Sequence, residues 1–115
     1  MAHLLLDIEG VDGRTPIGDA KFIETVVFDV AHRTQATVLN YMVHQFEPHG
    51  ATAILMLAES HLSAHTWPEN RSVHIDYYHC GGTSDELRAK LERAVDIFRQ
   101  WLPATQYKTQ ILSRC

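Results

Sequence analysis

A short segment near the middle of the chain constrains the fold more than any other part of the sequence. An apolar run from Ala53 to Ala58 is followed by the polar sequence ESHLSAHT and then by a Trp-Pro-Glu triplet. The apolar run predicts a buried strand, and Pro68 ends regular pairing after it because proline has no N–H to donate. Reactive side chains at a strand end are held rigidly while the adjoining turn exposes them. We therefore expect this segment to carry the chemistry of the protein.

The rest of the chain alternates between strand and helix patterns. Apolar and β-forming residues cluster or alternate at residues 2–9, 37–47, 51–58, 61–66, 72–79 and 105–112, which we predict to be strands. A helix is expected from Gly18 or Asp19, and a second after Thr83 and Glu86, whose spacing fits a capping box; Pro103 ends it. Helical spacing predicts that these residues face the core: Phe22, Ile23, Val26, Val27, Val30, Ala31, Leu87, Leu91, Ala94, Val95, Phe98 and Leu102.

This order of elements predicts an α+β two-layer sandwich, in which an antiparallel sheet carries both helices on one face. With 115 residues, the chain is expected to form a single domain spanning residues 1–115. The opposite face of the sheet then needs cover, which self-association would provide.

Composition argues against several classes of protein. A net charge of -4 gives no electrostatic case for binding nucleic acid or an anionic membrane. No apolar run reaches a membrane-spanning length, and the N-terminus lacks the basic start of a signal peptide, so we expect a cytoplasmic protein. The two cysteines, Cys80 and Cys115, make no metal framework, and a disulfide between them is not expected.

The segment from Ala58 to Glu69 resembles the self-cleavage site of the small bacterial and archaeal S-adenosylmethionine decarboxylases. In that family the pattern reads Ala-Glu-Ser-His-Leu-x-x-His-Thr-Trp-Pro-Glu, and every fixed position of it is present here. The match continues outward in register through Phe46-x-Pro48-x-Gly50 and Asp76-x-x-x-Cys80-Gly81, so it covers residues 44–81. A block this long and irregular is far more specific than a short motif.

The resemblance implies that the chain makes its own cofactor. In the family the serine hydroxyl attacks the preceding carbonyl carbon, here that of Glu59, and the peptide becomes an ester. Loss of the serine α-proton then splits the chain, here into residues 1–59 and 60–115, and Ser60 becomes a pyruvoyl group. That group forms a Schiff base with the substrate amine and serves as an electron sink during decarboxylation. The implied product is decarboxylated S-adenosylmethionine, which supplies spermidine synthesis.

The family also implies roles for other reactive residues. His65 matches the histidine that takes the α-proton, and a neutral imidazole suits that role near neutral pH. Thr52 matches a hydroxyl residue that stabilises the cyclic oxyoxazolidine intermediate. Cys80 matches the proton donor that quenches the decarboxylated carbanion.

Substrate contacts are implied in the same way. Phe46 and Trp67 match aromatic residues that sandwich the adenine ring, and Glu69 matches the acidic residue that accepts hydrogen bonds from the ribose hydroxyls. The resemblance further implies a homodimer in which sheet packs against sheet.

Several positions depart from the family pattern and leave alternatives open, among them Val11 in place of a cysteine and residues 70–74 in place of an aromatic- and alanine-rich segment. Glu9 stands where the family has an aromatic residue, and His79 replaces a small hydroxyl residue before the cysteine. A carboxylate such as Glu9 would pair with a second amine or a guanidinium, so L-arginine or L-ornithine is an alternative substrate for the same pyruvoyl chemistry. A third hypothesis is an uncleaved, catalytically silent homologue that acts as a binding partner.

Four histidines close to the motif raise the question of a metal site. His61 and His65 are four residues apart, which is a helical pairing, whereas this segment is expected to be extended. His74 and His79 differ in parity, so they face opposite sides of a regular strand. We therefore expect no zinc site.

Overall fold

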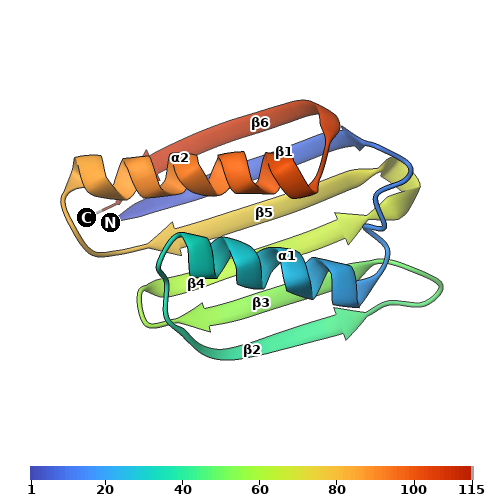
Figure 1. Ribbon diagram of the computed structural model, residues 1–115, viewed down its shortest axis with the longest axis horizontal. Coiled ribbons are helices and arrows are strands. Elements are labelled where there is room, and N and C mark those ends of the chain that lie inside the picture. Colours follow the sequence, from blue (N-terminus) through green and yellow to red (C-terminus); the bar gives the residue numbers. More distant parts are fainter. Residues whose placement is uncertain (115) are drawn as a thin grey trace.

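The structure is a computed structural model that describes residues 1–114, and it consists of one antiparallel sheet with two helices packed on it (Figure 1). The elements are β1 (Ala2–Val11), α1 (Ala20–Arg33), β2 (Val38–Gln45), β3 (Ala51–Leu57), β4 (Ser60–Trp67), the 3-10 helix η1 (Pro68–Asn70), β5 (Ser72–His79), α2 (Ser84–Trp101) and β6 (Ala104–Ser113). The predicted α+β two-layer sandwich is confirmed. The expectation about Cys115 lies outside the described residues.

The strands lie in the order β2-β3-β4-β5-β1-β6, and each is antiparallel to its neighbours. The C-terminal strand β6 therefore forms one edge of the sheet, and β2 forms the other. Strands β3 and β4 make a tight hairpin in which Leu57 pairs with Ser60, so the chain turns through Ala58 and Glu59. The motif thus occupies a hairpin near the middle of the sheet.

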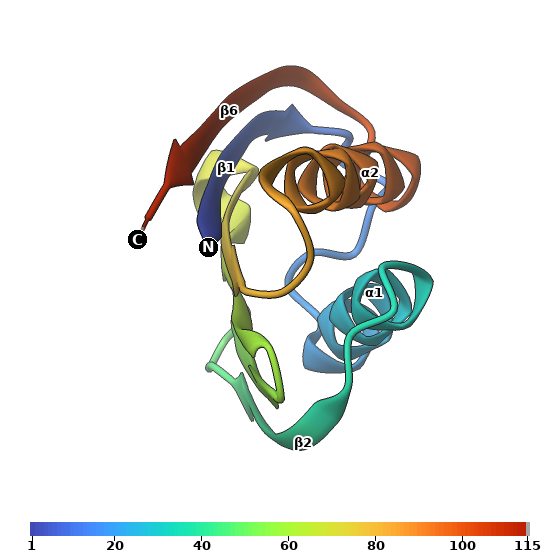
Figure 2. The same ribbon diagram turned by 90° about the vertical axis from the view of Figure 1, so that its left-hand side faces the viewer.

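Side-chain alternation gives the sheet two different faces. In β1, Leu4, Leu6 and Ile8 are fully buried and point toward the helices, while the intervening residues point away. Both helices lie on that one side of the curved sheet, and the other side is uncovered (Figure 2). We call the uncovered side the open face.

The helices begin as their sequences predict. Asp19 caps α1 by accepting a hydrogen bond from the backbone N–H of Lys21. At α2, Thr83 accepts from the N–H of Glu86, whose carboxylate accepts from the N–H of Thr83, so the predicted capping box is confirmed. Within residues 1–114, no helix combines the length and the apolar character needed to span a bilayer.

The helical core residues follow the predicted pattern with small differences. Val95 is only partly buried, whereas Ile97 is buried. The face of α2 that packs on the sheet is therefore rotated slightly about the helix axis from the predicted face. Phe22 is also partly buried, with its ring 5.9 Å from that of Trp101. The other predicted core residues of the two helices are buried: Ile23, Val26, Val27, Val30, Ala31, Leu87, Leu91, Ala94, Phe98 and Leu102.

Truncating Leu91 should destabilise the fold because its side chain is fully buried between α2 and the sheet. We expect Leu91→Ala to lower the free energy of unfolding by about 2–5 kcal/mol, through lost apolar burial and an unfilled cavity. Chemical denaturation at a fixed protein concentration measures the change. The exposed neighbour Glu92 gives the control, and an equal loss in Glu92→Ala would contradict the packing described here.

Candidate active site

The serine of the motif stands at the first position of β4, directly after the hairpin turn. Ser60 has a φ of 154°, a backbone conformation that residues with a side chain rarely adopt. The preceding Glu59 is tied down by its carboxylate, which accepts a hydrogen bond from the backbone N–H of Thr37 at 3.0 Å. The Glu59–Ser60 peptide therefore joins a residue with an uncommon φ to a glutamate whose side chain is hydrogen-bonded to the backbone of Thr37.

The carbonyl group of Glu59 accepts two hydrogen bonds from Cys80. The thiol donates to the carbonyl oxygen at 2.9 Å, and the backbone N–H of Cys80 donates to the same oxygen at 3.2 Å. Two donors aimed at one carbonyl oxygen would stabilise negative charge that develops there when a nucleophile attacks the carbonyl carbon. The structure thus brings Glu59, Ser60 and Cys80 together, and we call these three residues the serine group.

Five more of the predicted site residues line a separate hollow of about 240 Å³. It lies where β4 ends and η1 begins, and its lining includes Phe46, Thr52, His65, Trp67 and Glu69. We call these five residues the aromatic group. The Thr52 hydroxyl lies 3.0 Å from His65 Nδ1, because the two residues are paired across β3 and β4. Beside it, His49 Nε2 is 3.5 Å from the Glu69 carboxylate.

The serine group and the aromatic group lie at opposite ends of β4. Ser60 and His65 are five residues apart in one strand, and a strand rises about 3.4 Å per residue, so about 17 Å separates them. A histidine at that distance cannot take a proton from a serine of the same chain. The structure therefore divides the predicted site residues of this segment into two sets, one at each end of β4.

Glu9 lies apart from both groups. It is on β1, and its carboxylate pairs with the ammonium of Lys108 on the edge strand β6 at 3.1 Å. Both side chains are largely exposed, so the pair is a solvated surface contact.

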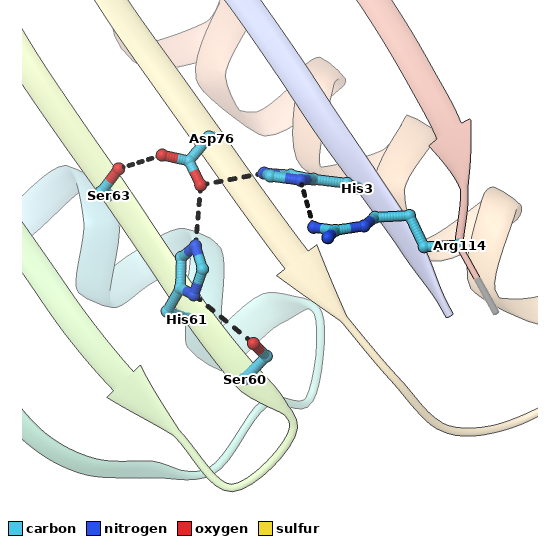
Figure 3. Close-up of polar contacts among 6 residues, drawn as sticks. All are labelled: His3, Ser60, His61, Ser63, Asp76 and Arg114. Atoms are coloured by element: carbon cyan, nitrogen blue, oxygen red, sulfur yellow. Dashed lines mark hydrogen bonds and ion pairs between the residues drawn. The ribbon is translucent and has the colours of Figure 1, made fainter.

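A cluster of polar side chains on the open face was not anticipated from the sequence. Asp76, which the sequence singles out only as part of the family match, accepts hydrogen bonds from three side chains (Figure 3). His3 Nε2 lies 3.0 Å and His61 Nε2 2.9 Å from the same carboxylate oxygen, and Ser63 donates to the other oxygen. Strand alternation could have predicted part of this cluster. Residues 61 and 63 of β4 lie on the same face of the sheet, and Ser63 pairs with Asp76 of β5.

These contacts determine the charge of Asp76. Burial by itself raises the pKa of the carboxyl, but the hydrogen bonds from Ser63, His3 and His61 outweigh it and hold the pKa of Asp76 below its usual value. The carboxylate form is therefore favoured at neutral pH.

The four histidines considered as metal ligands do not converge. His61 and His65 share the open face but lie four residues apart along β4, while His79 points toward the helices and His74 away from them. His79 is buried, and burial lowers its pKa, as does the nearby charge of Lys90. A different trio, His3, His61 and Asp76, places its potential ligand atoms within 4.8 Å of one another.

Comparison with known proteins agrees with the motif and the fold. The sequence model of the S-adenosylmethionine decarboxylase family matches residues 2–115. The S-adenosylmethionine decarboxylase proenzyme of Prochlorococcus marinus is 37% identical over 97% of this chain and 85% of its own length. The proenzyme of Archaeoglobus fulgidus is 33% identical over 97% of this chain and 95% of its own length.

A solved structure gives the same answer for the backbone. The crystal structure of the adenosylmethionine decarboxylase from Aquifex aeolicus superposes with a TM-score of 0.86 at 33% identity, covering 98% of this chain and 88% of the other. The fold and the strand-end serine therefore place the chain in a class of decarboxylases that share this sheet-and-helix layer. The chain belongs to the S-adenosylmethionine decarboxylase family.

Proposed function

We propose that the protein is a self-processing, pyruvoyl-dependent S-adenosylmethionine decarboxylase that acts as a cytoplasmic homodimer and supplies decarboxylated S-adenosylmethionine for spermidine synthesis. The observation that carries the proposal is the geometry at the Glu59–Ser60 bond. A serine in a strained backbone follows a carbonyl group whose oxygen already accepts two hydrogen bonds from Cys80. That arrangement favours attack of the serine hydroxyl on the Glu59 carbonyl carbon.

Processing would proceed through an ester between the Glu59 carbonyl carbon and Ser60 Oγ. A base would then remove the α-proton of Ser60, and the main-chain carboxylate of Glu59 would leave as the new C-terminus of a chain of residues 1–59. The second chain would begin with dehydroalanine at position 60, which water converts to a pyruvoyl group with loss of ammonia. A pyruvoyl group at that position supplies the electron sink that decarboxylation of an amino acid requires. Cys80, whose sulfur already reaches the Glu59 carbonyl, is placed to donate a proton at the same centre.

The proposed base, His65, must come from a second copy of the chain. It lies about 17 Å along the strand from Ser60, so the serine group of one protomer needs the aromatic group of another. In such a dimer the open faces of the two sheets would pack against each other. A two-fold axis between the sheets, perpendicular to the strands and level with Ser63, would place the serine group of each protomer opposite the aromatic group of its partner. Each dimer would then hold two sites, both built from residues of both protomers.

The open face has the apolar surface that such a dimer requires. The side chains of Met42, Ile54 and Met56 point outward from β2 and β3 and are 77%, 43% and 50% exposed. Burial of these side chains against a second sheet is favourable. Packing of the second sheet would also exclude water from the serine group. Exclusion of water slows the hydrolysis of reactive intermediates.

The aromatic group suits the adenosine part of S-adenosylmethionine better than it suits the side chain of arginine or ornithine. Phe46 and Trp67 present partly exposed rings at the hollow, and Glu69 offers acceptor oxygens at its rim. Glu9, the carboxylate that motivated arginine or ornithine as alternatives, is already paired with Lys108 and lies outside the hollow. Release of labelled carbon dioxide from carboxyl-labelled S-adenosylmethionine, arginine and ornithine tests the assignment. Release from arginine or ornithine but not from S-adenosylmethionine would overturn it.

Removing the indole of Trp67 should weaken substrate binding more than chemistry. Trp67 is 39% exposed and lines the hollow, and an aromatic pair contributes about 1 kcal/mol beyond its buried area. We expect Trp67→Ala to raise KM for S-adenosylmethionine about 5- to 10-fold with little change in kcat. Tyr41→Ala is the control, because that exposed ring packs on Phe28 at the helix side of β2. An unchanged KM in Trp67→Ala would exclude the stacking role.

A further inference from the structure

We propose that His61, oriented by Asp76, is the catalytic base that takes the hydroxyl proton of Ser60 in the first step of self-cleavage. The proposal rests on the proposed function and assigns a residue to a step that His65 of the same chain cannot reach. Ser60 Oγ lies 3.4 Å from His61 Nδ1, and His61 Nε2 lies 2.9 Å from Asp76 (Figure 3). Serine, histidine and carboxylate thus follow one another in hydrogen-bonding order, which is the arrangement that activates a hydroxyl nucleophile.

The contact between Ser60 and His61 depends on the unusual backbone at the serine. Neighbouring side chains in a regular strand point to opposite faces, so they do not meet. The φ of 154° at Ser60 allows its hydroxyl to approach the ring of the next residue, on the open face. The distance of 3.4 Å is longer than an optimal O–H···N hydrogen bond, as is common before the reacting groups close up. The uncommon backbone conformation of Ser60 therefore places its hydroxyl next to a potential base.

The hydrogen-bond network fixes which ring nitrogen of His61 is free to accept a proton. An ionised Asp76 can only accept, so His61 Nε2 carries the hydrogen and donates it. His61 Nδ1 then holds a lone pair that faces the Ser60 hydroxyl. This tautomer of the imidazole presents an acceptor to the hydroxyl, which is what a base in this step requires.

The same carboxylate is held in place from its other sides. Ser63 donates to Asp76 Oδ2, and His3 Nε2 donates to Oδ1. On the far side of His3, the Arg114 guanidinium lies 3.4 Å from His3 Nδ1 and donates to it. The ring of Tyr78 stacks on His3 at 5.2 Å and packs edge-on to His61 at 5.9 Å. Asp76 is thus a positioning residue, since it touches the reacting serine only through His61.

The step balances without any further reactant. The Ser60 proton moves to His61 Nδ1 as Oγ forms a bond to the Glu59 carbonyl carbon, and the carbonyl electrons move to an oxygen that Cys80 holds with two donors. The tetrahedral centre then collapses, the bond to the Ser60 nitrogen breaks, and His61 returns the proton to that nitrogen. An ester and a free amine result. His61 of one protomer and His65 of its partner would therefore serve successive proton transfers.

The test separates ester formation from the later elimination. In a His65→Ala background elimination stops, so the ester accumulates and hydroxylamine cleaves the chain between Glu59 and Ser60. We expect His61→Gln in that background to slow ester formation about 100-fold, because a glutamine amide can still donate to Asp76 but cannot accept the serine proton. His32→Gln, at an exposed position of α1, is the control and should form ester at the parent rate.

Each outcome has a defined meaning. Ester formation at the parent rate in folded His61→Gln would overturn the assignment while leaving the proposed function intact. Absence of ester in the parent His65→Ala chain, together with no cleavage of the natural chain, would overturn the proposed function and this step with it. Loss of natural cleavage on chelator treatment would also overturn the assignment, since a cation held by His3, His61 and Asp76 would then be required.

A second measurement tests the role of Asp76 independently of folding. Imidazole ¹⁵N shifts in the uncleaved Ser60→Ala chain should place the His61 hydrogen on Nε2, and Asp76→Asn should shift the population toward Nδ1. Asp76→Asn in the His65→Ala background should slow ester formation by at least about 10-fold. An unchanged tautomer with an unchanged rate would show that Asp76 does not position the ring.

Discussion

Replacing Ser60 by alanine should leave the chain uncleaved and catalytically inactive. Alanine has no hydroxyl to attack the Glu59 carbonyl carbon, so neither the ester nor the cofactor derived from it can form. Decarboxylation should fall to the uncatalysed background, because neither Glu59 nor Cys80 can act as an electron sink. Electrophoresis under denaturing conditions and an assay of labelled carbon dioxide release measure the two effects.

Ser113 provides a matched control for this change. It is exposed near the end of the edge strand β6, where it pairs with Ala2, and it belongs to neither group of site residues. Ser113→Ala should be cleaved and should turn over substrate like the natural chain. Turnover that survives in Ser60→Ala would exclude the self-made cofactor.

Co-expression of two inactive variants should restore part of the activity. Ser60→Ala lacks the nucleophile but keeps His65, whereas His65→Ala keeps Ser60 but lacks the base for elimination. If each site combines Ser60 of one protomer with His65 of the other, a mixed dimer contains one complete site and one site with both defects. Random pairing makes about half of the dimers mixed, so about a quarter of the natural activity should return.

The measurement requires each variant alone as its baseline, and both should be inactive. Differently tagged chains allow the mixed dimer to be isolated, and its specific activity should be about half that of the natural dimer. A mixed dimer without activity would place both residues in one protomer's site, which conflicts with their separation along β4.

Much of the fold follows from local sequence signals. Alternation in residues 72–79, the helical spacing after Asp19, and the capping box at Thr83 and Glu86 each identify an element to within a few residues. These signals are local because they depend on side-chain periodicity and on backbone groups nearby. The two-layer arrangement then follows, since each element buries one apolar face.

The arrangement of the site depends on information that the sequence does not state. Ser60 and His65 are close in sequence, and only their place in one extended strand shows that they are far apart in space. The contact of Asp76 with His61 depends on strand register, which pairs Ser63 with Asp76 across β4 and β5. The contact with His3 also requires β1 to lie next to β5, although the two are 73 residues apart at this contact. Strand order and register are set by the whole sheet rather than by any one segment.

The intact mass of the purified protein tests the central claim most directly. Two polypeptides that meet at Glu59 and Ser60, the second of them blocked to Edman degradation, are the predicted result, because a pyruvoyl group leaves no terminal amine. A single chain that keeps the mass of all 115 residues after prolonged incubation would contradict the account.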